Sequence, residues 1–226
     1  MARILSIETS TAVLSVALAQ DGTVVAERVC EEPRQQAALT APLVKEVLDA
    51  AGLQVGDCDA VCVSAGPGSY TGLRVGASTA KGLAFGAGIP LLSVGTLDIL
   101  VAGVIDHRDN YRIVPMIDAR RMEVYTAVFS PEGRQLTPVE AKVISADSFA
   151  DLLAEGPVLL VGDGAKKCSA VLRHPNVSFR EAAPLARHMA QLAEAAFRAG
   201  KFEDVAYFEP FYLKDFVATV SKKQLW

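Results

Sequence analysis

Apolar and polar residues alternate along the first thirty positions of the chain. This period of two is typical of strands that bury one face. It predicts strands over residues 3–7, 12–19 and 24–29, and Asp21 with Gly22 predicts a tight turn between the last two. The chain therefore begins with a predicted antiparallel sheet.

The pattern changes to a helical spacing from Gln36 onward. Apolar residues recur every three or four positions until Gly52, a residue suited to a left-handed helix end. Pro42 falls inside this pattern and predicts a kink or a later start of the helix. A continuous apolar run over residues 60–65 then predicts a buried strand, and residues 73–84 predict a second helix.

A glycine-rich turn joins this strand to the second helix. Its motif residues are Gly66, Pro67, Gly68, Ser69, Thr71, Gly72 and Gly76. Glycines in such a turn let backbone N–H groups approach an anion or another segment of the chain, because no Cβ intervenes. Their spacing matches neither the dinucleotide motif nor the Walker motif. A structural turn and a ligand-binding loop both remain open from the spacing alone.

The second half of the chain repeats the order of features in the first half. Residues 112–118 match the first strand and its terminal acid, residues 124–129 match the second strand, and residues 131–133 match the turn after it. Residues 158–164 resemble the strand and glycines at the start of the glycine-rich turn. A repeat of about a hundred residues indicates two copies of a domain, because solenoid repeats span only about 20–50 residues.

We therefore predict an α/β fold of two lobes, each a mixed sheet flanked by helices. The predicted boundaries are residues 1–104 for the first lobe and 105–226 for the second. Within the second lobe, residues 184–200 predict a helix that begins near Pro184 and ends at Gly200.

The first strand of each copy ends in an acid, Glu8 in one and Asp118 in the other. In a duplicated fold these carboxylates are expected to face each other across the cleft between the lobes. A pair of carboxylates can hold a metal ion or polarise a water molecule. An acid at a strand end can instead accept hydrogen bonds from turn N–H groups, and the polar residues after Glu8 favour that role there.

Composition narrows the classes of function. The chain has 226 residues, of which 51% are hydrophobic, and a net charge of −4. That charge argues against a protein that binds nucleic acid alone, although lysine pairs at 166–167 and 222–223 are local exceptions. No apolar run is long enough for a signal peptide or a membrane span. The four cysteines form no Cys-x-x-Cys pair, so we expect a cytoplasmic protein with reduced thiols.

Three motifs together resemble the bacterial TsaB (YeaZ) family. They are the opening segment 4–10, the glycine-rich turn 66–76 and the segment 117–125, and the resemblance runs from Met1 through Leu213. It implies duplicated ribonuclease-H-like lobes of the actin and sugar-kinase ATPase superfamily.

The resemblance also implies partners and a role. Family members are non-catalytic partners of a paralogous metalloprotein, TsaD. That enzyme transfers a threonylcarbamoyl group onto the adenosine beside the anticodon of tRNAs that read codons starting with adenine, and a small ATPase, TsaE, joins the complex. On this basis we expect no cofactor bound tightly by the chain alone, ATP or ADP only in the assembly, and tRNA only through the complex.

The candidate chemistry agrees with a non-catalytic role. The catalytic paralogue is expected to carry a His-x-x-x-His metal pair on its first helix, and the corresponding residues 33–40 contain no such ligand. The histidines, His107, His174 and His188, are scattered, so we expect no metal site and no catalytic residue. Two enzymatic alternatives stay open: an ATP-dependent small-molecule kinase that uses Asp118 or Glu8 with magnesium, and a peptidase.

The two helices provide the candidate partner surface. Small residues on one stripe of the second helix let another helix come close, and the resemblance implies that the family pairs through these helices in a four-helix packing. The predicted interface residues are Leu39, Leu43, Val47, Tyr70, Leu73, Arg74, Ala77 and Lys81. The alternative is that both stripes face the protein's own sheet. We also expect a homodimer through this surface, and Arg74, Lys81 and Arg120 are candidate contacts for nucleotide or tRNA.

Overall fold

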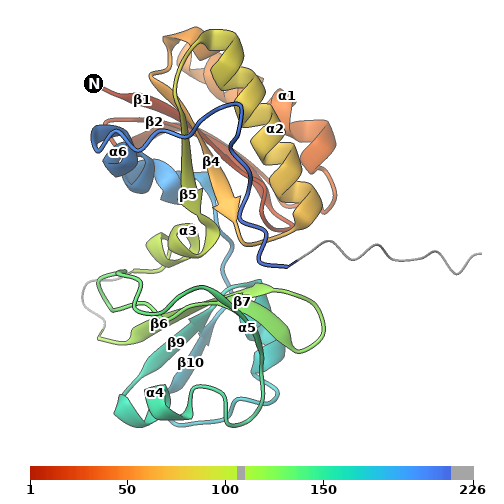
Figure 1. The fold of residues 1–226 in the computed structure, drawn as a ribbon, viewed down its shortest axis with the longest axis vertical. Helices are drawn as coiled ribbons and strands as arrows, with labels where there is room; N and C mark the ends of the chain where they lie inside the picture. The colour runs from red at the N-terminus through yellow and green to blue at the C-terminus, as the bar shows by residue number, and fades with distance from the viewer. Residues whose placement is uncertain (106–109, 215–226) are drawn as a thin grey trace, which may run out of the picture.

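The computed structural model describes residues 1–105 and 110–214, and it contains two mixed five-stranded sheets (Figure 1). The first sheet has the order β3-β2-β1-β4-β5. Its strands are β1 (Arg3–Glu8), β2 (Leu14–Gln20), β3 (Thr23–Cys30), β4 (Ala60–Gly66) and β5 (Leu91–Gly95). The first three strands pair antiparallel, and β4 and β5 continue the sheet in parallel with β1. The predicted three-stranded start is confirmed.

The second sheet repeats this arrangement, with the order β8-β7-β6-β9-β10. Its strands are β6 (Arg112–Asp118), β7 (Glu123–Thr126), β8 (Glu140–Val143), β9 (Val158–Val161) and β10 (Val177–Arg180). The pairs β6–β7 and β7–β8 are antiparallel, and β9 and β10 run parallel to β6. The predicted fold class, an α/β protein with duplicated ribonuclease-H-like sheets, is therefore confirmed.

Helices α1 (Gln36–Ala51), α2 (Tyr70–Ala87) and α3 (Thr96–Ala102) accompany the first sheet, with a short 3₁₀ turn η1 (Val55–Asp57). Helix α1 begins at Gln36, so the expected later start at Pro42 is wrong, and the proline lies inside the helix. The helix ends at Gly52 with φ +66°, the left-handed conformation that the sequence predicted.

The remaining helical segments are α4 (Ala150–Glu155), α5 (Asp163–Cys168), η2 (Ala186–Met189) and α6 (Ala190–Arg198). The single helix predicted over residues 184–200 is thus a 3₁₀ turn followed by a shorter α-helix. Both pack on the first sheet: Met189 shares a core with Ile4, and the Ala186 N–H donates to Ser15 Oγ at 2.8 Å. The chain therefore returns to the first sheet after building the second, while the boundary at residues 104 and 105 stays a prediction.

The strand predicted over residues 124–129 ends early, at Thr126. Phe129 is fully buried and exchanges two backbone hydrogen bonds with Ile113, in the same antiparallel register that pairs β7 with β6. The chain therefore stays beside β6 as far as Phe129, as the sequence predicted, although the regular strand is shorter. The turn predicted at residues 131–133 joins two antiparallel segments, because Phe129 pairs with Gln135 and the Ser130 N–H donates to the Arg134 carbonyl at 2.8 Å.

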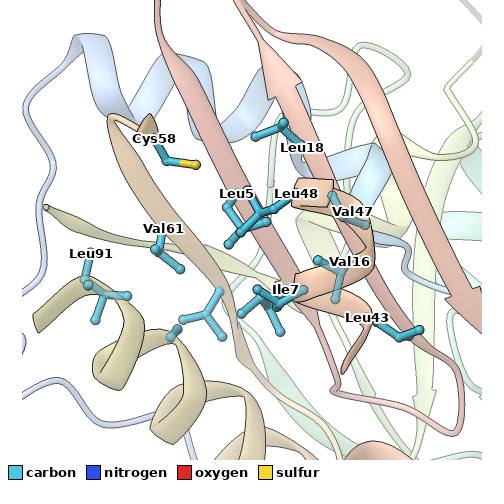
Figure 2. Close-up of a cluster of buried hydrophobic side chains, with 14 of the residues drawn as sticks. Leu5, Ile7, Val16, Leu18, Leu43, Val47, Leu48, Cys58, Val61 and Leu91 are labelled. Atoms are coloured by element: carbon cyan, nitrogen blue, oxygen red, sulfur yellow. The ribbon is translucent and has the colours of Figure 1, made fainter. Parts of the chain in front are cut away.

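The main core of the first lobe lies between the sheet and helices α1 and α2 (Figure 2). Alternate residues of β1 and β2 supply one side, and residues of α1 supply the other. Figure 2 labels Leu5, Ile7, Val16, Leu18, Leu43, Val47, Leu48, Cys58, Val61 and Leu91. Helix α3 carries apolar residues that pack with the second sheet, among them Leu97 and Leu100 against Ile113. All four cysteines are free thiols, and within 1–105 and 110–214 no helix has the length and apolarity to cross a membrane.

Candidate functional site

The glycine-rich turn packs directly on the segment that follows β1. A Cβ added at Gly68, Gly72 or Gly76 would come closer than 3.0 Å to atoms of Thr9 or Ser10. At Gly68 and Gly72 the obstructing atoms are backbone carbonyl oxygens, which no side-chain rotation can move. These glycines are needed for the close approach of two segments of the same chain.

Hydrogen bonds tie the same two segments together. The Ser69 N–H donates to the Ser10 carbonyl at 2.7 Å, and the Thr9 hydroxyl donates to the Gly72 carbonyl at 2.8 Å. The Ser69 hydroxyl caps α2 by accepting from the Gly72 N–H. The contacts of the turn therefore favour the structural interpretation over the ligand-binding one.

Glu8, one of the two predicted cleft acids, is completely buried beneath this contact. Its Oε1 accepts from the Ser10 N–H at 2.5 Å, while Oε2 has no hydrogen-bond partner in the described parts of the chain. Burial raises the pKa of the Glu8 carboxyl to about 7, although the bond from Ser10 opposes the shift. Below that pH the group is mainly an uncharged acid, which agrees with the turn-acceptor role expected from the sequence.

Asp118, the second predicted acid, lies in a different environment. It is exposed, and its Oδ1 accepts from Lys167 Nζ at 2.6 Å and from the Arg120 N–H at 2.7 Å. Its own N–H donates to Asp163 Oδ1 at 2.9 Å. Glu8 and Asp118 are topologically equivalent, but the hydrogen bonds of each stay within its own lobe, so the structure gives no contact that joins them.

The histidines are as scattered in space as in sequence. His107 lies outside the described residues, as do Lys222 and Lys223. His174 accepts from the Asn176 N–H, and His188 packs against Gly103, where burial and Arg187 lower its pKa to about 4. Over the ranges that the structure covers, no three His, Cys, Asp or Glu side chains form a group able to hold a metal ion.

Half of the predicted interface residues lie in the core. Leu43, Val47, Leu73 and Ala77 are all less than 9% exposed. Three of them, Leu43, Val47 and Ala77, belong to the main core cluster, in which Figure 2 labels Leu43 and Val47. They cannot also line an intermolecular surface in this fold. The prediction for these four is corrected: the apolar stripes of α1 and α2 face the protein's own sheet, which was the alternative interpretation.

The other predicted interface residues are nearer the surface. Arg74 is exposed and its guanidinium lies 5.5 Å from the ring centre of the half-buried Tyr70. Leu39 is partly buried at the edge of the core. Lys81 is engaged within the chain, since its Nζ donates to the carbonyl oxygens of Ala206 and Phe208 at 3.1 Å.

Those carbonyls belong to a segment that the sequence did not single out, residues 203–214, here termed the strap. It begins beside β5, where the Glu203 N–H donates to the Leu91 carbonyl and Glu203 Oε1 accepts from the Ser93 hydroxyl. It then crosses the glycine-rich turn, where the Phe211 N–H donates to the Ala65 carbonyl at 2.7 Å. Figure 1 shows this blue segment running over the ends of β4 and β5.

Two further contacts complete the strap. The rings of Tyr70 and Tyr212 lie 4.9 Å apart, and Lys214 Nζ forms an ion pair with Glu123 at the start of β7. The strap therefore connects α2 of the first lobe to the second sheet. Its only signal in the sequence is the cluster of aromatic residues at 207–212, which predicts neither the path nor the contacts.

Comparisons with known proteins show the family to which the chain belongs. A family model described as "TsaD: tRNA N6-adenosine threonylcarbamoyltransferase" matches residues 30–222. The tRNA threonylcarbamoyladenosine biosynthesis protein TsaB of Escherichia coli (strain K12) is 34% identical over 96% of both chains. The protein of the same name from Bacillus subtilis (strain 168) is 36% identical over 70% of both chains. The chain belongs to the TsaB family. It is also a member of the wider family that the TsaD model describes.

The fold agrees with this membership. YeaZ from Pseudomonas aeruginosa superposes with a TM-score of 0.83 at 27% identity, over 94% of this chain and all of that one. A match of that extent includes both sheets. Two of the three motifs that resembled the TsaB family contact each other in the structure. These are the opening segment 4–10 and the glycine-rich turn.

In this TsaB-family chain, several residues on the solvent side of the first halves of α1 and α2 are small. Ala37, Ala38 and Ala41 are exposed on α1, and Thr71, Ser78 and Gly82 are exposed on α2. A shallow pocket of about 400 Å³ lies over the start of both helices and is lined by Ala37, Tyr70, Thr71, Arg74, Val75, Ser78 and Thr79. Short side chains leave the helix backbones accessible to another helix.

Proposed function

We propose that this chain acts in the biosynthesis of threonylcarbamoyladenosine in tRNA, as a non-catalytic subunit that binds a TsaD-type enzyme and joins a TsaE-type ATPase in the assembly. The names of its TsaB relatives support the pathway. The observation that carries the role as a binding subunit is the solvent face of α1 and α2, where small side chains together with Tyr70 and Arg74 line a shallow pocket. Aromatic and arginine side chains of this kind often anchor protein interfaces.

The surroundings of Glu8 support a role in which this chain catalyses no reaction itself. Its carboxyl is buried and bound to the Ser10 N–H, and the glycine-rich turn is filled by Thr9 and Ser10. A nucleotide phosphate or a metal ion would have to displace these contacts. A kinase that uses Glu8 would thus require the glycine-rich turn to separate from residues 9 and 10.

We expect charges on the solvent face to prevent partner binding. In the Val75→Glu, Ser78→Glu variant, two carboxylates would be buried against the partner without counterions, so co-purification with the TsaD-type protein is lost. Both positions lie outside the core, and we expect the Tm to change by no more than about 2 °C, as for surface substitutions. Pull-down and thermal unfolding of the full chain provide the two measurements.

Two control variants distinguish loss of partner binding from a general effect of added charge and from loss of folding. Leu136→Glu with Ala170→Glu adds the same charge to exposed positions of the second lobe, and it should leave co-purification intact. Leu73→Glu puts a charge into the core and should abolish folding rather than binding alone. Normal co-purification of the Val75→Glu, Ser78→Glu variant would contradict the proposed surface.

Nucleotide binding separates the subunit role from the kinase alternative. We expect calorimetric titration of Mg-ATP into the isolated chain to give no saturable heat, and titration into the assembly to give binding. The reason is that the chain's own contacts occupy the cleft end of β1. Saturable binding and phosphoryl transfer by the chain alone would favour the kinase.

The function itself is tested by mass spectrometry of tRNA nucleosides. Purified TsaD- and TsaE-type proteins with tRNA, ATP and a threonylcarbamoyl donor should form the modified adenosine only when this chain is added. Modification of equal extent without the chain would refute the proposed role.

A further inference from the structure

The turn between β6 and β7 carries two consecutive arginines in an unusual conformation. Arg120 has φ +70° and Arg121 has φ +51°, both in the left-handed region that glycine and asparagine adopt far more readily. The turn is well held, since Asp118 Oδ1 accepts from the Arg120 N–H and the Glu123 N–H donates to the Arg120 carbonyl. A sequence selected only for a stable turn would place Asn or Gly here. Strained positions of this kind occur mainly where the side chain has a function.

The two acids that flank the arginines in sequence are already paired with lysines. Asp118 binds Lys167, and Glu123 binds Lys214. The guanidinium groups of Arg120 and Arg121 are exposed and form no ion pair with any residue of 1–105 or 110–214. Asp118 and Glu123 thus each have a lysine partner, and the two guanidinium groups remain available to an anion from outside the chain.

The turn is connected to the proposed partner surface. Lys214 of the strap binds Glu123 at the base of the turn, and Tyr212 of the same strap lies on Tyr70 of α2. Arg74 lies over that ring. A chain of contacts through the strap thus links Arg74 on the first lobe to the arginine turn on the second, and the arginine at each end is exposed.

We propose that Arg120 and Arg121 bind backbone phosphates of the tRNA while this chain is held in the assembly, an inference that rests on the proposed function. Guanidinium groups bind phosphate oxygens in a bidentate geometry and stay charged at every physiological pH. Two phosphate contacts on a chain with a net charge of −4 are too few to hold RNA without other subunits. The arginine turn therefore adds to an affinity that the partner supplies.

The test measures binding of a tRNA transcript to the complete assembly across a series of salt concentrations. For Arg120→Gln with Arg121→Gln we expect about tenfold weaker binding at physiological salt, and a slope of log K against log salt that is smaller by about 1–2, because two phosphate contacts release fewer counterions. Arg134→Gln with Arg173→Gln removes the same charge from exposed positions elsewhere that have no positive φ, and it should leave both values unchanged.

A second variant separates binding from folding. In Arg120→Asn with Arg121→Asn, a residue suited to positive φ replaces each arginine, so the Tm should stay the same or rise by about 2 °C while tRNA binding weakens as for the glutamine variant. An unchanged salt slope in both variants would overturn the inference, as would loss of subunit co-purification in place of weaker tRNA binding. Failure of the wild-type chain to join the assembly, by contrast, would count against the proposed function itself.

Discussion

Replacement of Gly72 by alanine is expected to destabilise the fold by roughly 3 kcal/mol or more. The added methyl group would overlap the Thr9 carbonyl oxygen, which is part of the backbone and cannot rotate away. Overpacking of this kind costs about 1–3 kcal/mol. Separation of the two segments would also break the buried hydrogen bond from the Thr9 hydroxyl to the Gly72 carbonyl, worth about 1 kcal/mol. Urea unfolding followed by circular dichroism gives the free energy directly.

The same helix contains a matched control. Gly82 is exposed, and an added Cβ would meet no atom within 4 Å. Alanine is favoured over glycine inside a helix by about 0.5–1 kcal/mol, so Gly82→Ala should stabilise the protein by that amount. Equal effects of the two substitutions would show that the contact between α2 and residues 9–10 does not require a glycine.

Replacement of Glu8 by glutamine is expected to stabilise the protein above pH 7 by up to roughly 3 kcal/mol. The pKa of Glu8 is raised from 4.5 to about 7 in the folded state, and each unit corresponds to about 1.4 kcal/mol. A raised pKa means that the folded state binds the proton more tightly than the unfolded state. The stability from this proton is therefore fully present below pH 4.5 and is lost as the pH rises through 7. Glutamine keeps an acceptor for the Ser10 N–H and carries no charge at any pH.

The measurement is the difference in unfolding free energy between Glu8→Gln and the wild type at pH 5 and at pH 8. The difference should be small at pH 5 and large at pH 8. Glu32→Gln, at an exposed position, should show no such trend, which controls for the general loss of a negative charge. A difference that does not grow with pH would mean that Glu8 is already ionised in the folded protein.

Local signals in the sequence were sufficient for most of the first lobe. The alternation that ends at Glu8 predicts β1, and the helical spacing that ends at Gly52 predicts α1, because period and capping depend on residues close together in the chain. The duplication could also be predicted, since each copy repeats a strand, an acid and a turn in the same order. Segment 117–125, one of the motifs that indicated the family, also contains the arginine turn.

The sequence could not show whether the apolar side of each helix faces the protein's own sheet or the solvent. An apolar stripe on a helix has the same spacing whether it faces its own sheet or a partner, and only packing placed Leu43 and Leu73 inside. The glycines were likewise ambiguous until Thr9 and Ser10 were found against them.

The other features of the fold depend on contacts between residues that are far apart in the chain. The return of α6 to the first sheet and the path of the strap depend on contacts such as Ala186 with Ser15 and Lys214 with Glu123. The amino-acid sequence by itself thus determined most elements of the first lobe, the repetition of the fold and the family. Only the tertiary structure decided which faces are buried and which remain for a partner, because burial depends on neighbours that no local pattern specifies.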